Sequence, residues 1–268
     1  MPEGPEVKIM SDNLNNILKG KEIIEINYLR QNKSPNNFLY LQEHLTFKVK
    51  EINAKGKMLY FLFDKDVYMI VTLGMTGIWS LEKQKHAVLE IKYIDNSKEK
   101  NVYFVDIRKF GKIYIYKNKE DFDKKLDSIG PDLLSKNDLN FDLFKDILMR
   151  KKQWNITKGL MDQSLMSGIG NYLKSEILFA SRISPHRNIE DITDKELKIL
   201  YTQARKIIKE SYVLGGLSVK DFLNIEGKEG ESYKLIKVYC KTKIDGKKIK
   251  KEKTKDGRTT HWVPELQT

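Results

Sequence analysis

The chain has 268 residues, 40% of them hydrophobic, which supplies a sizeable core and excludes a disordered protein. The 49 Lys and Arg outnumber the 37 Asp and Glu and give a net charge of +12, which indicates a polyanionic partner such as nucleic acid or an anionic surface. There is no apolar run of about 18 residues and no signal-like N-terminus, which predicts a soluble, intracellular protein that does not bind membranes.

Metal binding is disfavoured by the composition. Cys240 is the only cysteine, so an intramolecular disulfide is excluded. The histidines are too widely scattered to give zinc-ligand spacing with it. We therefore predict no structural metal. We also expect a monomer that uses no small-molecule cofactor. The four histidines are His44, His86, His186 and His261.

The first seven residues contain a candidate nucleophile. If Met1 is removed, Pro2 becomes a secondary amine with Glu3 beside it. An α-amine has a pKa near ~8, against ~10.4 for a lysine side chain, so more of it is unprotonated at neutral pH. Such an amine can attack a sugar C1′ and form an iminium. The alternative is an ordinary tail ahead of a helix.

A helix followed by short strands is predicted for residues 1–130. Apolar residues of 6–18 fall on one helical face, and Gly20 is placed to end the helix. The β-branched and aromatic segments that follow predict a β-sandwich or barrel. The expected strands are 22–29, 45–53, 57–63, 67–73, 87–94, 101–105 and 112–116.

Two further domains are expected after a boundary at Gly130-Pro131. Residues 131–234 carry helical stripes, including a helix opened by Thr193 and Glu196 as a capping box. Residues 235–268 return to strand-like alternation around Asp-Gly pairs at 245–246 and 256–257, which are typical of two-residue hairpin turns. The predicted fold class is therefore a multidomain α+β protein.

A glycine-containing segment precedes a predicted helix at 161–172. Gly168 and Gly170 allow a tight turn, and the helix start after them offers N–H groups that suit a phosphate. This pattern is compatible with a phosphate clamp. A plain helix start with Asn171 as N-cap is the alternative.

The segment 241–258 has nine basic residues and three acidic residues, so it carries +6. A hairpin with this charge would follow a phosphate backbone, with Arg258 projecting at its tip. A solvated charged arm remains the alternative.

Two loops combine residues that suit contacts with bases. Arg108 and Phe110 are two residues apart before a glycine, so both could enter a base stack. Alternatively, Phe110 lies in the core and Arg108 pairs with Asp106. Met75, between glycines, is either a wedge or part of a turn, and Lys57 reaches a phosphate or is surface charge.

Taken in chain order, these segments resemble the Fpg/Nei family of DNA glycosylases with associated AP-lyase activity. The resemblance covers essentially the whole chain, because many separate motifs occur in the family's order. The motifs are Pro2 to Val7, Gly56-Lys57, Leu73 to Gly77, Asp106 to Gly111, Gly130 to Asp132, the helix-two-turn-helix signature Asp162 to Asn171 with Glu176, and Gly257 to Thr260 with Gln267.

The resemblance implies a role for each matching residue. Pro2 would form a Schiff base with C1′, Glu3 would protonate the sugar oxygen, and Glu6 would support the site. The predicted phosphate ligands and gap-filling residues form two further groups. Lys57, Asn171, Arg258 and Lys158 would bind phosphates, while Met75, Arg108 and Phe110 would fill the gap left by a flipped nucleotide.

The C-terminus departs from most of the family, which ends in a four-cysteine zinc finger. It resembles the zincless finger of some endonuclease VIII-like members, which remove oxidised pyrimidines and ring-opened purines. We therefore expect a β,δ-AP lyase of that branch acting on lesion-containing or abasic DNA. The alternatives are an Fpg-type enzyme for 8-oxoguanine and formamidopyrimidines, favoured by Met75, Arg108 and Phe110, and a catalytically inactive damage-binding protein.

Overall fold

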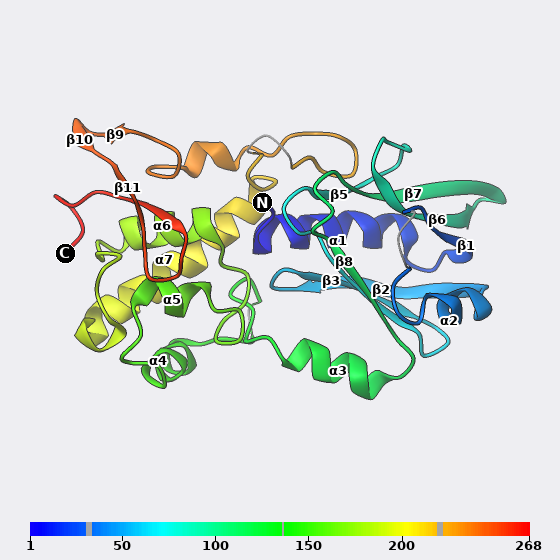
Figure 1. The fold of residues 1–268 in the computed structure, drawn as a ribbon, viewed down its shortest axis with the longest axis horizontal. Helices are drawn as coiled ribbons and strands as arrows, with labels where there is room; N and C mark the ends of the chain where they lie inside the picture. Colours follow the sequence, from blue (N-terminus) through cyan, green and yellow to red (C-terminus); the bar gives the residue numbers. More distant parts are fainter. Residues whose placement is uncertain (31–33, 136, 219–221) are drawn as a thin grey trace. The chain divides into compact units, whose positions relative to one another are not determined.

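The computed structural model describes residues 1–30, 34–135, 137–218 and 222–268. The chain forms two compact units. The first contains Met1–Pro2, Glu6–Ser128 and Gly215–Glu231, and the second contains Glu3–Pro5, Ile129–Leu214 and Ser232–Thr268. The expected mixed α+β class is confirmed (Figure 1). The division into domains 1–130, 131–234 and 235–268 stays a prediction.

An antiparallel sheet of eight strands builds the first unit, in the order β5-β7-β6-β1-β2-β3-β4-β8. Figure 1 shows helix α1 between the β5-β7-β6 strands and the β2-β3-β8 strands, which gives the expected sandwich. The elements are α1 (Gly4–Leu18), β1 (Glu22–Tyr28), α2 (Phe38–Glu43), β2 (Phe47–Lys55), β3 (Met58–Phe63), β4 (Tyr68–Thr72), β5 (Gly77–Ser80), β6 (Ala87–Asp95), β7 (Lys98–Asp106), β8 (Lys112–Tyr116) and α3 (Lys119–Asp127).

The core of this unit follows from the spacing of apolar residues, which repeats every two residues in the strands and every three or four in helix α1. Every second residue of β3 is buried, because successive side chains of a strand point to opposite faces. The buried apolar residues of α1 that belong to the core are spaced three or four apart and join the strand residues in one apolar cluster. The helix contributes Val7, Met10, Leu14 and Leu18, and the strand contributes Leu59, Phe61 and Phe63.

Helices dominate the second unit. Helix α6 is buried along most of its length, whereas α7 buries one stripe and exposes the rest. Among the described segments, no helix is long and apolar enough to span a bilayer. The helices are α4 (Phe141–Met149), α5 (Ile156–Met161), α6 (Asn171–Ala180), the short η1 (Ile189–Asp191), α7 (Asp194–Val213) and the short η2 (Ser232–Leu235).

The C-terminal segment of the second unit forms two antiparallel ribbons. β9 (Lys243–Ile244) pairs with β10 (Lys247–Lys248) through the expected Asp245-Gly246 turn. β11 (Lys250–Lys253) pairs with β12 (Thr259–Trp262). The prediction of a two-residue turn at Asp256-Gly257 is wrong for this pair. The connecting loop runs over 254–258 and is closed by a hydrogen bond from Thr254 N to Arg258 O of 3.0 Å. The tip is therefore wider than an Asp-Gly turn.

Candidate active site and DNA interface

Glu3 is fixed at the start of α6, within the second unit. Its buried carboxylate accepts hydrogen bonds from Gly170 N at 2.7 Å, Tyr172 N at 2.9 Å and Leu173 N at 3.3 Å. The first N–H groups of a helix have no partner within the helix and carry its positive end, so they suit a carboxylate. Glu3 is thereby held at the helix start, and Pro2, the residue before it in the chain, is also buried.

The glycines of the turn between α5 and α6 make this contact possible. A Cβ on Gly170 would lie 2.2 Å from the Glu3 carboxyl carbon. Gly168 has a φ of +103° and its carbonyl accepts a hydrogen bond from Gly4 N at 2.8 Å. The glycines therefore let the N-terminal segment approach the helix start.

The expectation of unpaired amides in this turn is wrong, whereas its binding of phosphate stays a prediction. Gly170 N is bound to Glu3, and Gly168 N donates to Gln163 Oε1 at 3.1 Å. Asn171 as N-cap was also wrong, because Gly170 occupies that position. Asn171 is the first helical residue, and its side-chain nitrogen donates to Thr259 O at 3.0 Å. The Asn171 side chain therefore ties the helix start to the segment that follows Arg258.

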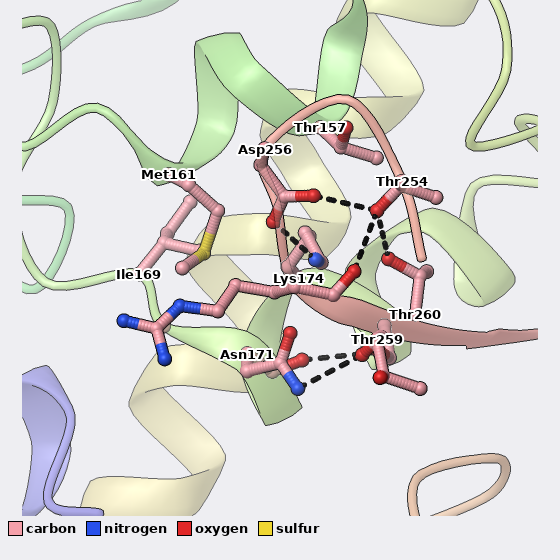
Figure 2. A network of polar contacts seen from close by, with 12 residues as sticks. Thr157, Met161, Ile169, Asn171, Lys174, Thr254, Asp256, Thr259 and Thr260 are labelled. Carbon is pink, nitrogen blue, oxygen red and sulfur yellow. Dashed lines mark hydrogen bonds and ion pairs between the residues drawn. The ribbon is translucent and has the colours of Figure 1, made fainter. Parts of the chain in front are cut away.

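Arg258 is exposed at the end of the loop between β11 and β12. The loop is tied to α6 by the Asn171–Thr259 hydrogen bond and by an ion pair of 2.5 Å between Lys174 Nζ and Asp256 Oδ2 (Figure 2). The structure therefore brings Asn171 and the Arg258 loop together.

Glu176, part of the helix-two-turn-helix signature, holds the start of the C-terminal segment. Its buried carboxylate accepts hydrogen bonds from three successive backbone amides, at 2.9 Å, 3.0 Å and 2.7 Å. Burial raises the pKa of Glu176, and the three N–H donors oppose that shift. The donors are Lys237, Val238 and Tyr239. Glu176 therefore has a structural part in the second unit.

Glu6 has a comparable part in the first unit. Its buried carboxylate accepts a hydrogen bond from Leu217 N at 2.8 Å. Gly216, with a φ of +80°, passes so close that a Cβ there would lie 3.0 Å from Glu6 Cγ. Glu6 therefore fixes the beginning of the loop that follows α7.

A buried aspartate joins the two loops predicted to contact bases. Asp106 is completely buried and accepts hydrogen bonds from Thr76 Oγ1 at 2.8 Å and Gly111 N at 2.7 Å. Arg30 completes the site with an ion pair of 3.2 Å. The loop that carries Met75 is thereby attached to the loop 107–111.

The side chains of the second loop point away from the core. Phe110 is 54% exposed, and the Arg108 guanidinium lies 5.1 Å from its ring centroid. The alternative with Phe110 in the core and Arg108 paired with Asp106 is therefore wrong, since Arg30 occupies that position. Phenylalanine is one of the side chains that proteins insert between base steps, and insertion by Phe110 stays a prediction. Met75, half-buried on the attached loop, completes the group.

The remaining predicted ligands lie on turns and helices. Lys57 is half-buried in the turn between β2 and β3, after Gly56 with a φ of +55°. Lys158 is exposed on α5, and its ammonium lies 3.8 Å from the centroid of Trp154. Both lysine side chains are at least partly accessible to solvent.

Sequence reasoning missed the residues that hold the site. Thr76 and Asp106 lie inside recognised motifs, but their contact joins positions 30 residues apart. Lys174 and Asp256 carried no signal beyond being charged residues in a helix stripe and a turn. A lysine on a helix that otherwise buries its neighbours was the available hint.

The turn that binds Glu3 at the start of α6, the exposed Arg108-Phe110 loop and the basic C-terminal ribbons are features expected of a DNA-repair glycosylase. Residues 1–113 match the model of the formamidopyrimidine-DNA glycosylase N-terminal domain, and residues 129–222 match that of its H2TH domain. The chain belongs to this family, and the expected class of enzyme, a bifunctional glycosylase and AP lyase, is confirmed.

Curated relatives and solved structures agree over the full length. The chain is 31% identical to formamidopyrimidine-DNA glycosylase of Rickettsia africae, covering 89% of this chain and 88% of the relative. It is 29% identical to formamidopyrimidine-DNA glycosylase of Listeria monocytogenes, covering 100% of each chain. A variant of Lactococcus lactis Fpg bound to Fapy-dG DNA superposes with a TM-score of 0.88 at 27% identity over both entire chains. The wild-type enzyme bound to oxidised-pyrimidine DNA gives 0.87 at 27%, again over both entire chains.

Proposed function

We propose that this protein is an Fpg-type enzyme of base excision repair that removes formamidopyrimidines and oxidised purines from DNA and then cleaves the abasic strand. The observation that carries the proposal is the match to formamidopyrimidine-DNA glycosylases over the whole chain. It favours the Fpg-type alternative over the endonuclease VIII-like specificity. The exposed Arg108-Phe110 pair beside the Met75 loop supports the same branch.

The chemistry would begin at Pro2 once Met1 has been removed. Its amine attacks C1′, the base departs, and an iminium joins protein and sugar. Glu3, oriented by the start of α6, protonates the sugar oxygen as the ring opens. Elimination of the 3′ and then the 5′ phosphate would leave a one-nucleotide gap.

DNA would be held by phosphate contacts from Lys57, Asn171, Arg258 and Lys158. Met75, Arg108 and Phe110 would occupy the gap in the duplex. The proposal includes a monomer that needs no metal and no small-molecule cofactor, because one cysteine cannot supply a zinc finger.

Borohydride trapping tests this proposal with protein whose loss of Met1 is verified by intact mass. Duplexes would contain formamidopyrimidine or 8-oxoguanine opposite cytosine, an oxidised pyrimidine, an abasic site or no lesion. We expect covalent adducts with the abasic site and the two purine lesions, and none with undamaged DNA. No adduct with any duplex would indicate a damage-binding protein without chemistry. Faster trapping on the pyrimidine lesion would restore the endonuclease VIII-like assignment.

A further inference from the structure

Helix α6 contains a lysine with no solvent-exposed side chain. Lys174 is 0% exposed and pairs with the Asp256 carboxylate, 2% exposed, at 2.5 Å. Burial lowers the pKa of Lys174, and the hydrogen bond and charge of Asp256 oppose that shift. A buried ammonium is costly unless it is paired, so the position of Asp256 is tightly coupled to α6.

Asp256 transmits this constraint to the loop that carries Arg258. Its second carboxylate oxygen accepts a hydrogen bond from Thr254 Oγ1 at 2.5 Å, and Thr254 N donates to Arg258 O at 3.0 Å. Figure 2 shows Asp256 between Lys174 and Thr254. The Lys174 ammonium therefore fixes a carboxylate that shapes the loop up to Arg258.

A second contact from the same helix face holds the other side of Arg258. Asn171, three residues before Lys174, donates to the carbonyl of Thr259 at 3.0 Å. The backbone of Arg258 is thus held before and after the residue, whereas its side chain is exposed.

The ribbon β11-β12 requires such support. It pairs four residues with four, and a lone two-stranded hairpin is marginally stable in water. Within the described part of the chain, no group of three or more His, Cys, Asp and Glu is placed to hold a metal ion. The contacts with α6 are restraints that act directly on this loop.

We propose that Lys174 is a positioning residue: its buried ion pair with Asp256 holds the loop so that Arg258 meets a DNA phosphate. The pair does in this chain what a structural metal does in other short ribbons. The inference rests on the proposed DNA-binding function. Lys174 itself touches no DNA, because no part of its side chain is exposed.

Salt-dependent binding of a duplex with a tetrahydrofuran abasic-site analogue tests this role. We expect Arg258→Ala to reduce the slope of log K against log salt by ~0.9, the value for one phosphate contact. Lys174→Met should reduce it by the same amount, and the double variant no further. Lys145→Met, which removes a surface ion pair of 2.5 Å with Asp194, should keep the wild-type slope.

Asp256→Asn separates positioning from charge. It removes a negative charge, so simple electrostatics predicts an unchanged or steeper slope and equal or tighter binding. Loss of the ion pair predicts a shallower slope and weaker binding. This variant keeps the size of the Asp256 side chain and lies in a loop rather than within α6, so it decides the matter alone if Lys174→Met does not fold.

The outcomes are distinct. Wild-type slopes in both variants, or additive losses in the double variant, would overturn the inference, even if urea unfolding showed lower stability. Equal, non-additive losses would support it. A wild-type protein that binds the abasic-site analogue no better than undamaged DNA would instead contradict the proposed function.

Discussion

Glu3 shows how one side chain depends on a distant helix. Its carboxylate oxygens receive three N–H donors from residues 170–173, so both oxygens are oriented before any substrate arrives. Preorganised donors of this kind keep a catalytic group in place without reorganisation during the reaction. The same contacts make Glu3 important for stability as well as for the chemistry proposed for it.

We therefore expect Glu3→Gln to lower the free energy of unfolding by about 1–3 kcal/mol, because an amide leaves a helix-start N–H facing an NH₂ group. Urea unfolding of the whole protein measures this change. Glu99→Gln, on a side chain 65% exposed, is the control and should alter stability little. Equal stability of Glu3→Gln and the wild type would show that the helix-start contacts add nothing.

Phe110 provides the opposite case, a large apolar side chain that contributes little to the core. Because it is 54% exposed, Phe110→Ala should change unfolding free energy by less than ~0.5 kcal/mol while lowering affinity for lesion DNA. Phe104→Ala, at a completely buried position, should cost about 3–5 kcal/mol. Unfolding and binding titrations distinguish the two. A large stability loss in Phe110→Ala with unchanged DNA binding would refute the wedge assignment.

At the scale of an element, helix α7 depends on its first turn. Thr193 and Glu196 form the expected capping box, and Arg187 pairs with Glu196 at 2.5 Å. The hydrogen bond from Arg187 lowers the pKa of Glu196 to about 2, with further contributions from Thr193. The start of the helix is therefore sensitive to acid.

The direction of this sensitivity follows from linkage. Because the folded pKa lies below the unfolded value of about 4.3, the stabilisation is complete above that value and is lost as pH falls towards about 2. The stability difference between the wild type and Glu196→Gln should therefore be largest near pH 6 and shrink below pH ~4. Urea unfolding at several pH values measures it. Glu210→Gln, whose partner Lys206 lies 3.9 Å away, is the control on the same helix. A difference that does not vary with pH would exclude the ionised pair as its cause.

Elements that sequence patterns missed share a physical cause. Helix α3 has one buried apolar residue, Phe122, and is supported by the Asn118 cap and by ion pairs such as Lys119–Asp123. Strand β5 directly follows the turn at 74–76 and is formed by its pairing with β7. Helix α2, with six residues, is too short to show a clear period. The sequence patterns of these elements are weak, because α3 is highly charged, β5 adjoins a turn and α2 is short. Tertiary contacts decide their structure instead of local preference.

At the scale of the whole molecule, local periodicity predicted most strands, and β8 was predicted with the observed bounds. The ordered motifs predicted the family and the candidate residues. What sequence could not supply was contact across long separations, such as Glu3 with Tyr172 or Lys174 with Asp256, 169 and 82 residues apart. Such pairs carry no periodic signal, since each partner lies in a different local pattern.

The positive charge of the molecule is unevenly distributed, since the segment 241–258 carries +6 of the net charge of +12. If the C-terminal ribbons follow a phosphate backbone, replacing three exposed lysines there by glutamine should flatten the salt dependence for damaged and undamaged duplexes alike, by ~0.9 for each lost contact. The ratio of the two affinities should be unchanged, because phosphate contacts carry no base information. The variant combines Lys248→Gln, Lys253→Gln and Lys255→Gln.

A matched triple variant on α3 separates location from net charge. Lys119→Gln, Lys124→Gln and Lys125→Gln remove the same charge from an element with no proposed DNA contact. Both variants are compared with the wild type in titrations between 50 and 200 mM salt. Over this range the Debye length falls from about 14 Å to about 7 Å. If charge acts only through the field of the whole molecule, the two slopes will fall equally. If the ribbons contact the backbone, only the C-terminal variant will lose whole phosphate contacts, and the α3 variant will keep a slope close to that of the wild type.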